Sequence, residues 1–130
     1  MAKSLTSTIL VTSTSNAANG TVRGTVDLSL ADGGIVTLKI TNGGTGPTVQ
    51  CEARILIAHA QASLPAAGAE GSSATAWKQV ATYGGGLVAN ISTRGSYRFG
   101  REVAYLEVEF TGNTGQAVTV EAYCTSHQEV

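Results

Sequence analysis

The stretch that decides the fold is "FTGNTGQAVTVEAYC", which runs from Phe110 to Cys124. In its second half every second residue is apolar, at Val118, Val120, Ala122 and Cys124. Successive side chains of a β-strand point to opposite faces of a sheet, so this period predicts a strand with one buried face. "EVAYLEVEF" (102–110) alternates in the same way, and "TGNTG" (111–115) has the glycines of a tight turn. The stretch therefore predicts a hairpin of two antiparallel strands, 102–110 and 116–125.

The same period of two extends outward through the chain. Alternating runs cover 21–30, 35–41, 48–59 and 76–83, and shorter candidates cover 87–92 and 96–99 around a turn at 93–95. Between Leu56 and Ala60 the polar positions are lost, which predicts burial on both faces there. Residues 60–75 are rich in Ala, Gly and Ser without any period, and we expect a long surface loop.

About eight strands with one polar face each favour two antiparallel sheets whose apolar faces cover each other. The expected fold is an all-β sandwich, jelly-roll-like, with an immunoglobulin-like topology as the alternative. The order Cys51, Trp77, Cys124 resembles the immunoglobulin pattern, but Ala122 occupies the position of the conserved tyrosine two residues before the second cysteine. Both cysteines are expected to be reduced core residues, although a disulfide between them remains open.

Length and charge limit the possible functions. A chain of 130 residues fits one domain, which we place at 19–130, preceded by a polar N-terminal arm at 1–18 that is ordered against a neighbour. Charged residues make up 13% and the net charge is −1, with Lys and Arg scattered, so no nucleic-acid partner is expected. No apolar stretch of membrane-spanning length and no signal peptide is recognisable.

Residues capable of chemistry form no convincing site. His59 and His127 stand at spacings from Cys51 and Cys124 that match no structural zinc pattern. Glu107, Glu109 and Glu121 are expected close together across the hairpin, as a solvated face rather than an acid–base pair. The glycine-rich segments lack the context of a phosphate loop. We therefore expect no catalytic residue, no metal and no cofactor, and hence a protein that is not an enzyme.

The aromatic residues leave a binding function open. Tyr105 and Tyr123 would lie on the outer faces of adjacent hairpin strands, as an ordinary cross-strand pair or as a small platform for a sugar. Trp77 follows the long loop and would serve as a core lid or as an interface anchor. These three side chains are the basis for an alternative function as a carbohydrate-binding module.

Three segments carry a resemblance to a known family: "TNGGTGPTVQCEARI" (41–55), "ATAWKQVAT" (74–82) and "VEFTGNTGQAVTVEAY" (108–123). Together they resemble small structural proteins of tailed bacteriophages that decorate or cement the capsid. The resemblance implies a β-sandwich that forms a dimer or trimer and binds the outer surface of the major capsid protein, without catalysis. Its location would be the virion, assembled in the host cytoplasm. A receptor-binding or tail-associated phage protein is the other alternative.

The candidate contacts with a partner come from the arm, two loops and the exposed aromatic residues. They are Ser4, Leu5, Ile9, Val11, Thr45, Pro47, Leu64, Trp77, Tyr105 and Tyr123.

Overall fold

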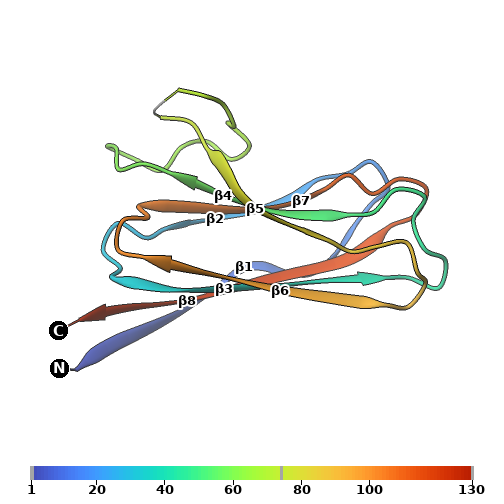
Figure 1. Ribbon diagram of the computed structural model, residues 1–130, viewed down its shortest axis with the longest axis horizontal. Coiled ribbons are helices and arrows are strands. Elements are labelled where there is room, and N and C mark those ends of the chain that lie inside the picture. Colours follow the sequence, from blue (N-terminus) through green and yellow to red (C-terminus); the bar gives the residue numbers. More distant parts are fainter. Residues whose placement is uncertain (1, 74, 130) are drawn as a thin grey trace.

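The computed structural model describes residues 2–73 and 75–129. The outermost positions of the predicted arm and domain, 1 and 130, and position 74 of the predicted loop lie outside the described residues. Within them the chain forms eight β-strands stacked as two layers (Figure 1). The strands are β1 (Lys3–Asn16), β2 (Val22–Asp27), β3 (Gly33–Asn42), β4 (Glu52–Ala58), β5 (Lys78–Gly84), β6 (Ser92–Gly100), β7 (Tyr105–Thr111) and β8 (Val118–Glu129).

The strand order is that of a jelly roll. Sheet A has the order β1-β8-β3-β6 and sheet B the order β2-β7-β4-β5. Every described pair is antiparallel, and only β4–β5 joins strands that are consecutive in the chain. The chain therefore crosses repeatedly between the sheets, as in two interleaved Greek keys. The predicted all-β sandwich with a jelly-roll arrangement is confirmed.

The predicted hairpin is wrong. β7 lies in sheet B and β8 in sheet A, so the turn between them is an arch that joins the two sheets. Asn113 holds this arch from inside, because its side-chain amide donates to the carbonyls of Asn16 at 3.2 Å and Gln116 at 3.0 Å. Asn16 returns a bond of 2.7 Å to the Asn113 side-chain oxygen. The apolar faces of β7 and β8 thus meet across the core instead of lying side by side.

The N-terminal segment also differs from the expected arm. Residues 3–16 are β1, which pairs antiparallel with β8 of the same chain from Lys3↔Glu129 to Asn16↔Val118. Irregularities between Ile9 and Thr14 turn Val11 into the core, where it is 5% exposed. Gly24 of β2 has no room for a side chain because the backbone carbonyl of Leu10 lies against it. β1 is therefore an integral edge strand that helps to close the sandwich.

The core lies between the inner faces of the two sheets. Its largest fully buried members include Ile40 of β3, Ile55 of β4 and Phe110 of β7. Cys51 and Cys124 are both free and buried in this core, as expected for reduced thiols. Burial raises the pKa of each thiol to about 11, so neither is a reactive thiolate at neutral pH.

The short strand expected at 87–92 and the turn at 93–95 are also wrong. β6 runs without interruption from Ser92 to Gly100, and 85–91 is a loop. Asn42 organises this loop, because its side-chain amide donates to the carbonyls of Gly85, Gly86 and Val88 at 3.2, 3.3 and 2.9 Å. One buried side chain at the end of β3 thus replaces the strand pairing that the apolar residues of 87–91 suggested.

Candidate functional site

The two outer faces of the sandwich differ in what covers them. We call the outward side of sheet A face A and that of sheet B face B. The β4–β5 loop, residues 59–73 and 75–77, rises from the end of β4 on the side of sheet B (Figure 1). The described part of the chain lays no comparable segment over face A.

Face B is closed by a second small apolar cluster. Its buried members are Leu56, Ala58, Trp77, Ala104 and Tyr105. Trp77 is fully buried and its indole Nε1 donates to the carbonyl of Ala66 at 2.9 Å. The Tyr105 hydroxyl donates to the carbonyl of Gln61 at 2.9 Å. Both polar groups are therefore satisfied by the loop that covers them, as buried aromatic side chains require.

An ion network next to this cluster fastens the loop to the sheet. Arg54 donates to both carboxylate oxygens of Glu70 in the loop, at 2.7 and 2.8 Å, and to Glu109 of β7 at 2.7 Å. Arg23 of β2 reaches the other oxygen of Glu109 at 2.9 Å. Since Glu109 is only 5% exposed, these charge-assisted bonds compensate its desolvation.

Glu107 lies beside the network and has no full complement of partners. It is completely buried, and Oε1 accepts the backbone N–H of Gly68 at 2.9 Å. Gly68 has φ +78, a conformation that favours glycine. Oε2 is buried with no partner among the described residues. Burial raises the pKa of Glu107, an effect that the Gly68 bond and the charge of Arg23 only partly offset.

Face A is built from rows of side chains across β6, β3, β8 and β1. Register places Ser96, Thr37 and Tyr123 in one row, which ends at Ile9. The next row consists of Arg94, Lys39 and Glu121. On the other side lies the row Arg98, Ile35, Thr125 and Ser7, followed by Gly100, Gly33, His127 and Leu5.

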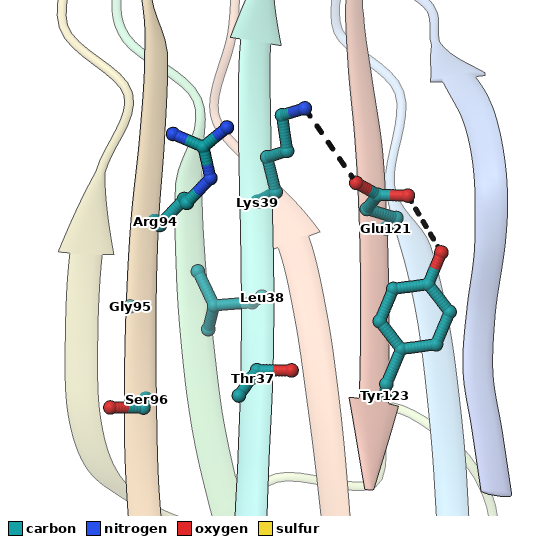
Figure 2. Close-up of a pocket in the computed structure, with 8 residues that line it drawn as sticks. All are labelled: Thr37, Leu38, Lys39, Arg94, Gly95, Ser96, Glu121 and Tyr123. Atoms are coloured by element: carbon teal, nitrogen blue, oxygen red, sulfur yellow. Dashed lines mark hydrogen bonds and ion pairs between the residues drawn. The ribbon is translucent and has the colours of Figure 1, made fainter.

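Short side chains in these rows leave an open hollow of about 380 Å³ (Figure 2). The Tyr123 ring stands on one side of Thr37, and Arg94 and Lys39 lie together at one end. The Tyr123 hydroxyl donates to Glu121 at 2.7 Å, and this bond to a carboxylate raises the pKa of the tyrosine. Tyr123 is 41% exposed, so an aromatic ring and charged groups are all accessible here.

A second hollow of about 360 Å³ lies further along the same face. It is lined by Gly34 and Ile35 of β3, between Arg98 on one side and Leu5 on the other. Leu5 is 60% exposed and Ile9 is 63% exposed, so apolar side chains accompany both hollows along β1.

Face A is net basic on a chain with a net charge of −1. In the described part of the chain its cations are Lys3, Lys39, Arg94 and Arg98, and its carboxylates are Glu121 and Glu129. These cations are half of the eight Lys and Arg residues of the sequence. Lys39 Nζ lies 4.0 Å from Glu121 Oε1, which makes a loose ion pair. No ion pair of Arg94 or Arg98 occurs within the described residues, so their charge is available to a partner.

The structure divides the ten candidate contacts. Six of them are exposed: Ser4, Leu5, Ile9, Thr45, Leu64 and Tyr123. The other four, Val11, Pro47, Trp77 and Tyr105, are buried and so offer no surface to a partner.

The structure separates two groups of residues, aromatic and acidic, that the sequence placed together. Tyr105 lies on face B under the loop and Tyr123 on face A, so they form no joint platform. Glu107 and Glu109 likewise lie on face B, whereas Glu121 lies on face A. The sequence placed Thr37, Lys39 and Arg98 on predicted strands and Arg94 in a predicted turn, and only the pairing of β6, β3 and β8 brings them together.

Within residues 2–73 and 75–129, no group of three or more His, Cys, Asp or Glu side chains is arranged to hold a metal ion. No helix in this part of the chain is long and apolar enough to cross a membrane.

Comparison with known proteins supports the fold alone. No family model matches the sequence, and no curated protein matches it at a significant level. The K3 cleaved adhesin domain of Lys-gingipain from Porphyromonas gingivalis is similar at a TM-score of 0.57 and 10% identity, over 88% of this chain and 73% of that one. A chain in the structure of infectious bursal disease virus, Gx strain, gives a TM-score of 0.58 and 9% identity, over 97% of this chain and 32% of that one.

A third similar structure is the SPBc2 prophage-derived protein YomS, with a TM-score of 0.45 and 16% identity over 97% of this chain and 96% of that one. Its similarity is too low to carry an argument. What the comparisons establish is a β-sandwich fold shared with proteins that are about 10% identical in sequence or less.

Proposed function

We propose that this protein is a virion structural protein of a tailed bacteriophage, which decorates or cements the capsid and docks through face A. The observation that carries the proposal is the contrast between the faces. Face B is covered by the chain's own loop, and Trp77, Arg54 and Glu109 there already have hydrogen-bond or ion-pair partners. Face A leaves apolar, aromatic and cationic side chains open on a rigid sheet.

This face suits a protein partner with an acidic surface. Arg residues and a tyrosine are enriched where protein interfaces form, and cations on the rim steer association with an anionic patch. Many copies on one shell would each bridge neighbouring capsid subunits, and their contributions to the mechanical resistance of the shell would add. The partner in this proposal is the major capsid protein, and the protein would reach the virion surface by assembly in the host cytoplasm. The role is mechanical and involves no catalysis or cofactor.

The resemblance of the sequence to capsid decoration proteins supports the proposal independently of face A. The jelly-roll fold is also found in a chain of a virus structure, but at 9% identity this likeness concerns the fold alone. Neither observation identifies the docking surface, which rests on the geometry of face A.

The test is co-sedimentation of the purified protein with capsids of its phage that lack it. Arg94→Glu combined with Arg98→Glu should abolish binding, because the double substitution reverses the net charge of face A. Both side chains are exposed, so the protein should still fold. Arg101→Glu is the matched control: this side chain is 70% exposed and pairs only loosely, at 3.6 Å, with Asp32. Wild-type protein that stays in the supernatant overturns the proposal, and equal loss in the Arg101→Glu control overturns the assignment to face A.

One observation favours a second candidate, saccharide binding in the Tyr123 hollow. An exposed ring beside hydroxyl and charged groups can stack on a sugar and bond its hydroxyls. A glycan array would show this as a specific signal that Tyr123→Ala removes. Capsid binding that survives Tyr123→Ala, with no glycan signal, would exclude this candidate.

A further inference from the structure

The N-terminal half of β1 presents a free sheet edge. Within the described residues β1 pairs only with β8, so along its other side the backbone N–H and C=O groups have no strand partner. Such an edge is a template for another strand and is normally blunted by charges, prolines or bulges.

The two halves of β1 differ in this protection. Between Ile9 and Thr14 the register with β8 shifts twice, and such bulges spoil an edge for further pairing. From Lys3 to Ile9 the register is regular, with one charge at its start and no proline. This regular half projects from the body together with the end of β8 (Figure 1). A second chain can therefore approach it without meeting sheet B.

The sequence of this half is complementary to itself. In an antiparallel pairing of two β1 strands centred on Ser7, Leu5 of one copy lies opposite Ile9 of the other, and Thr6 lies opposite Thr8. Leu5 and Ile9 both point out of face A and are 60% and 63% exposed. Shifting the centre by one residue in either direction separates Leu5 from Ile9. No two charges oppose each other, because Lys3 is the single charged residue between 3 and 9 and lies outside residues 5–9, which pair among themselves.

We propose that a second copy of this chain pairs with β1 over the regular residues 5–9 by antiparallel β-addition centred on Ser7, giving a two-fold symmetric dimer. The two A sheets become one continuous eight-stranded sheet, with both A faces on the same side. The backbone bonds supply the pairing, and the two Leu5–Ile9 contacts fix its register. The proposal does not depend on the proposed function.

The experiment is light scattering coupled to size exclusion on the full chain over a range of concentrations. Wild type should be a dimer. Ser7→Lys should be a monomer, because it sets two lysines opposite each other at the two-fold axis. Ser7→Glu should be a monomer for the same reason. An equimolar mixture of the two variants should restore the dimer, since each axis then holds one Lys and one Glu.

Ser15→Lys is the matched control, because Ser15 is an exposed residue of the bulged half of β1 and pairs with Thr119. It should remain a dimer, and circular dichroism establishes that all three variants are folded. A monomeric or trimeric wild type overturns the proposal. So does a dimer that tolerates Ser7→Lys, or a pair of monomeric variants that do not associate when mixed.

Discussion

Face A and face B are outer surfaces of two sheets of the same size and pairing, yet only one is open. On face B the residues Leu56, Ala58 and Tyr105 are apolar where alternation calls for polar side chains, and the β4–β5 loop covers them. On face A the equivalent positions carry Thr37, Lys39 and Tyr123, and solvent covers them. The difference shows that the apolar core of a jelly roll can stop at the inner face of a sheet or extend to its outer face. An outer face is buried where a loop between strands is long enough to fold back over it and cover it with apolar side chains.

The largest effect should come from Trp77→Ala, which removes the centre of the cover over face B. Loss of a fully buried aromatic side chain costs about 3–5 kcal/mol of unfolding free energy. Tyr123→Ala on face A is the matched control and should change stability by about 0.5 kcal/mol or less. Denaturant unfolding measures both. Equal losses of unfolding free energy would contradict the conclusion that face B is part of the packed core and face A is not.

A smaller effect should follow from Glu109→Ala, which leaves Arg23 and Arg54 without their shared carboxylate. Charge-assisted bonds to a buried group are each worth about 1.5–3 kcal/mol, and we expect a loss of about 2–3 kcal/mol in total because both arginines keep access to water. Glu121→Ala on face A should cost about 0.5 kcal/mol or less. A thermal melt in which Glu109→Ala matches Glu121→Ala would contradict the fastening role of the network.

A pH-dependent effect should distinguish Glu107 from the rest of face B. Arg23 and Arg54 already balance Glu70 and Glu109, so an ionised Glu107 is the excess charge. Because burial raises its pKa above that of the unfolded chain, the folded state holds this proton more tightly. That stability is complete below the ordinary glutamate pKa and is lost as the pH rises through the raised value.

Glu107→Gln cannot ionise, so its stability relative to wild type should increase as the pH rises through this window. Unfolding of both proteins between acidic and alkaline pH measures the difference. A constant difference, or one that shrinks with rising pH, would contradict a raised pKa for Glu107.

The smallest effect should appear on face A itself. Glu121→Gln removes the carboxylate that raises the pKa of Tyr123, so one tyrosine should begin to ionise at a lower pH. Ultraviolet difference titration against wild type detects this change, and Tyr123→Phe identifies the signal by removing it. An unchanged titration would mean that the Tyr123–Glu121 bond is not formed in solution.

Much of the fold was predictable from the period of two. Alternation located most of the strands, the sandwich and the buried thiols, and the loss of polar positions after Leu56 predicted its burial on both faces. That prediction is confirmed for Leu56 and Ala58, while His59 and Ala60 are exposed. The arch at 112–117 was missed because a hairpin and an arch need the same pattern, one apolar face on each flanking strand. Only the partner across the core separates them.

The candidate site depended on this missing information. Lys39 was a polar position of a predicted strand and Arg94 was placed in a predicted turn, and nothing in their spacing indicated that β3 and β6 are neighbours. Tyr105 and Tyr123 were placed together because the hairpin was assumed, and they lie on opposite faces. The residues of β1 were treated as an arm because Thr and Ser lend a polar character to an edge strand.

By itself the sequence determined which side chains share a face of each strand, because the pleat of a β-strand fixes that relation locally. It also determined that the chain would need two sheets, since each strand has one apolar face to bury. Only the tertiary structure decided which strands lie side by side, which outer face the β4–β5 loop covers, and that half of β1 is left as a free edge. Those outcomes depend on contacts between residues far apart in the chain. The free energy of each such contact depends on how all the strands and loops pack together.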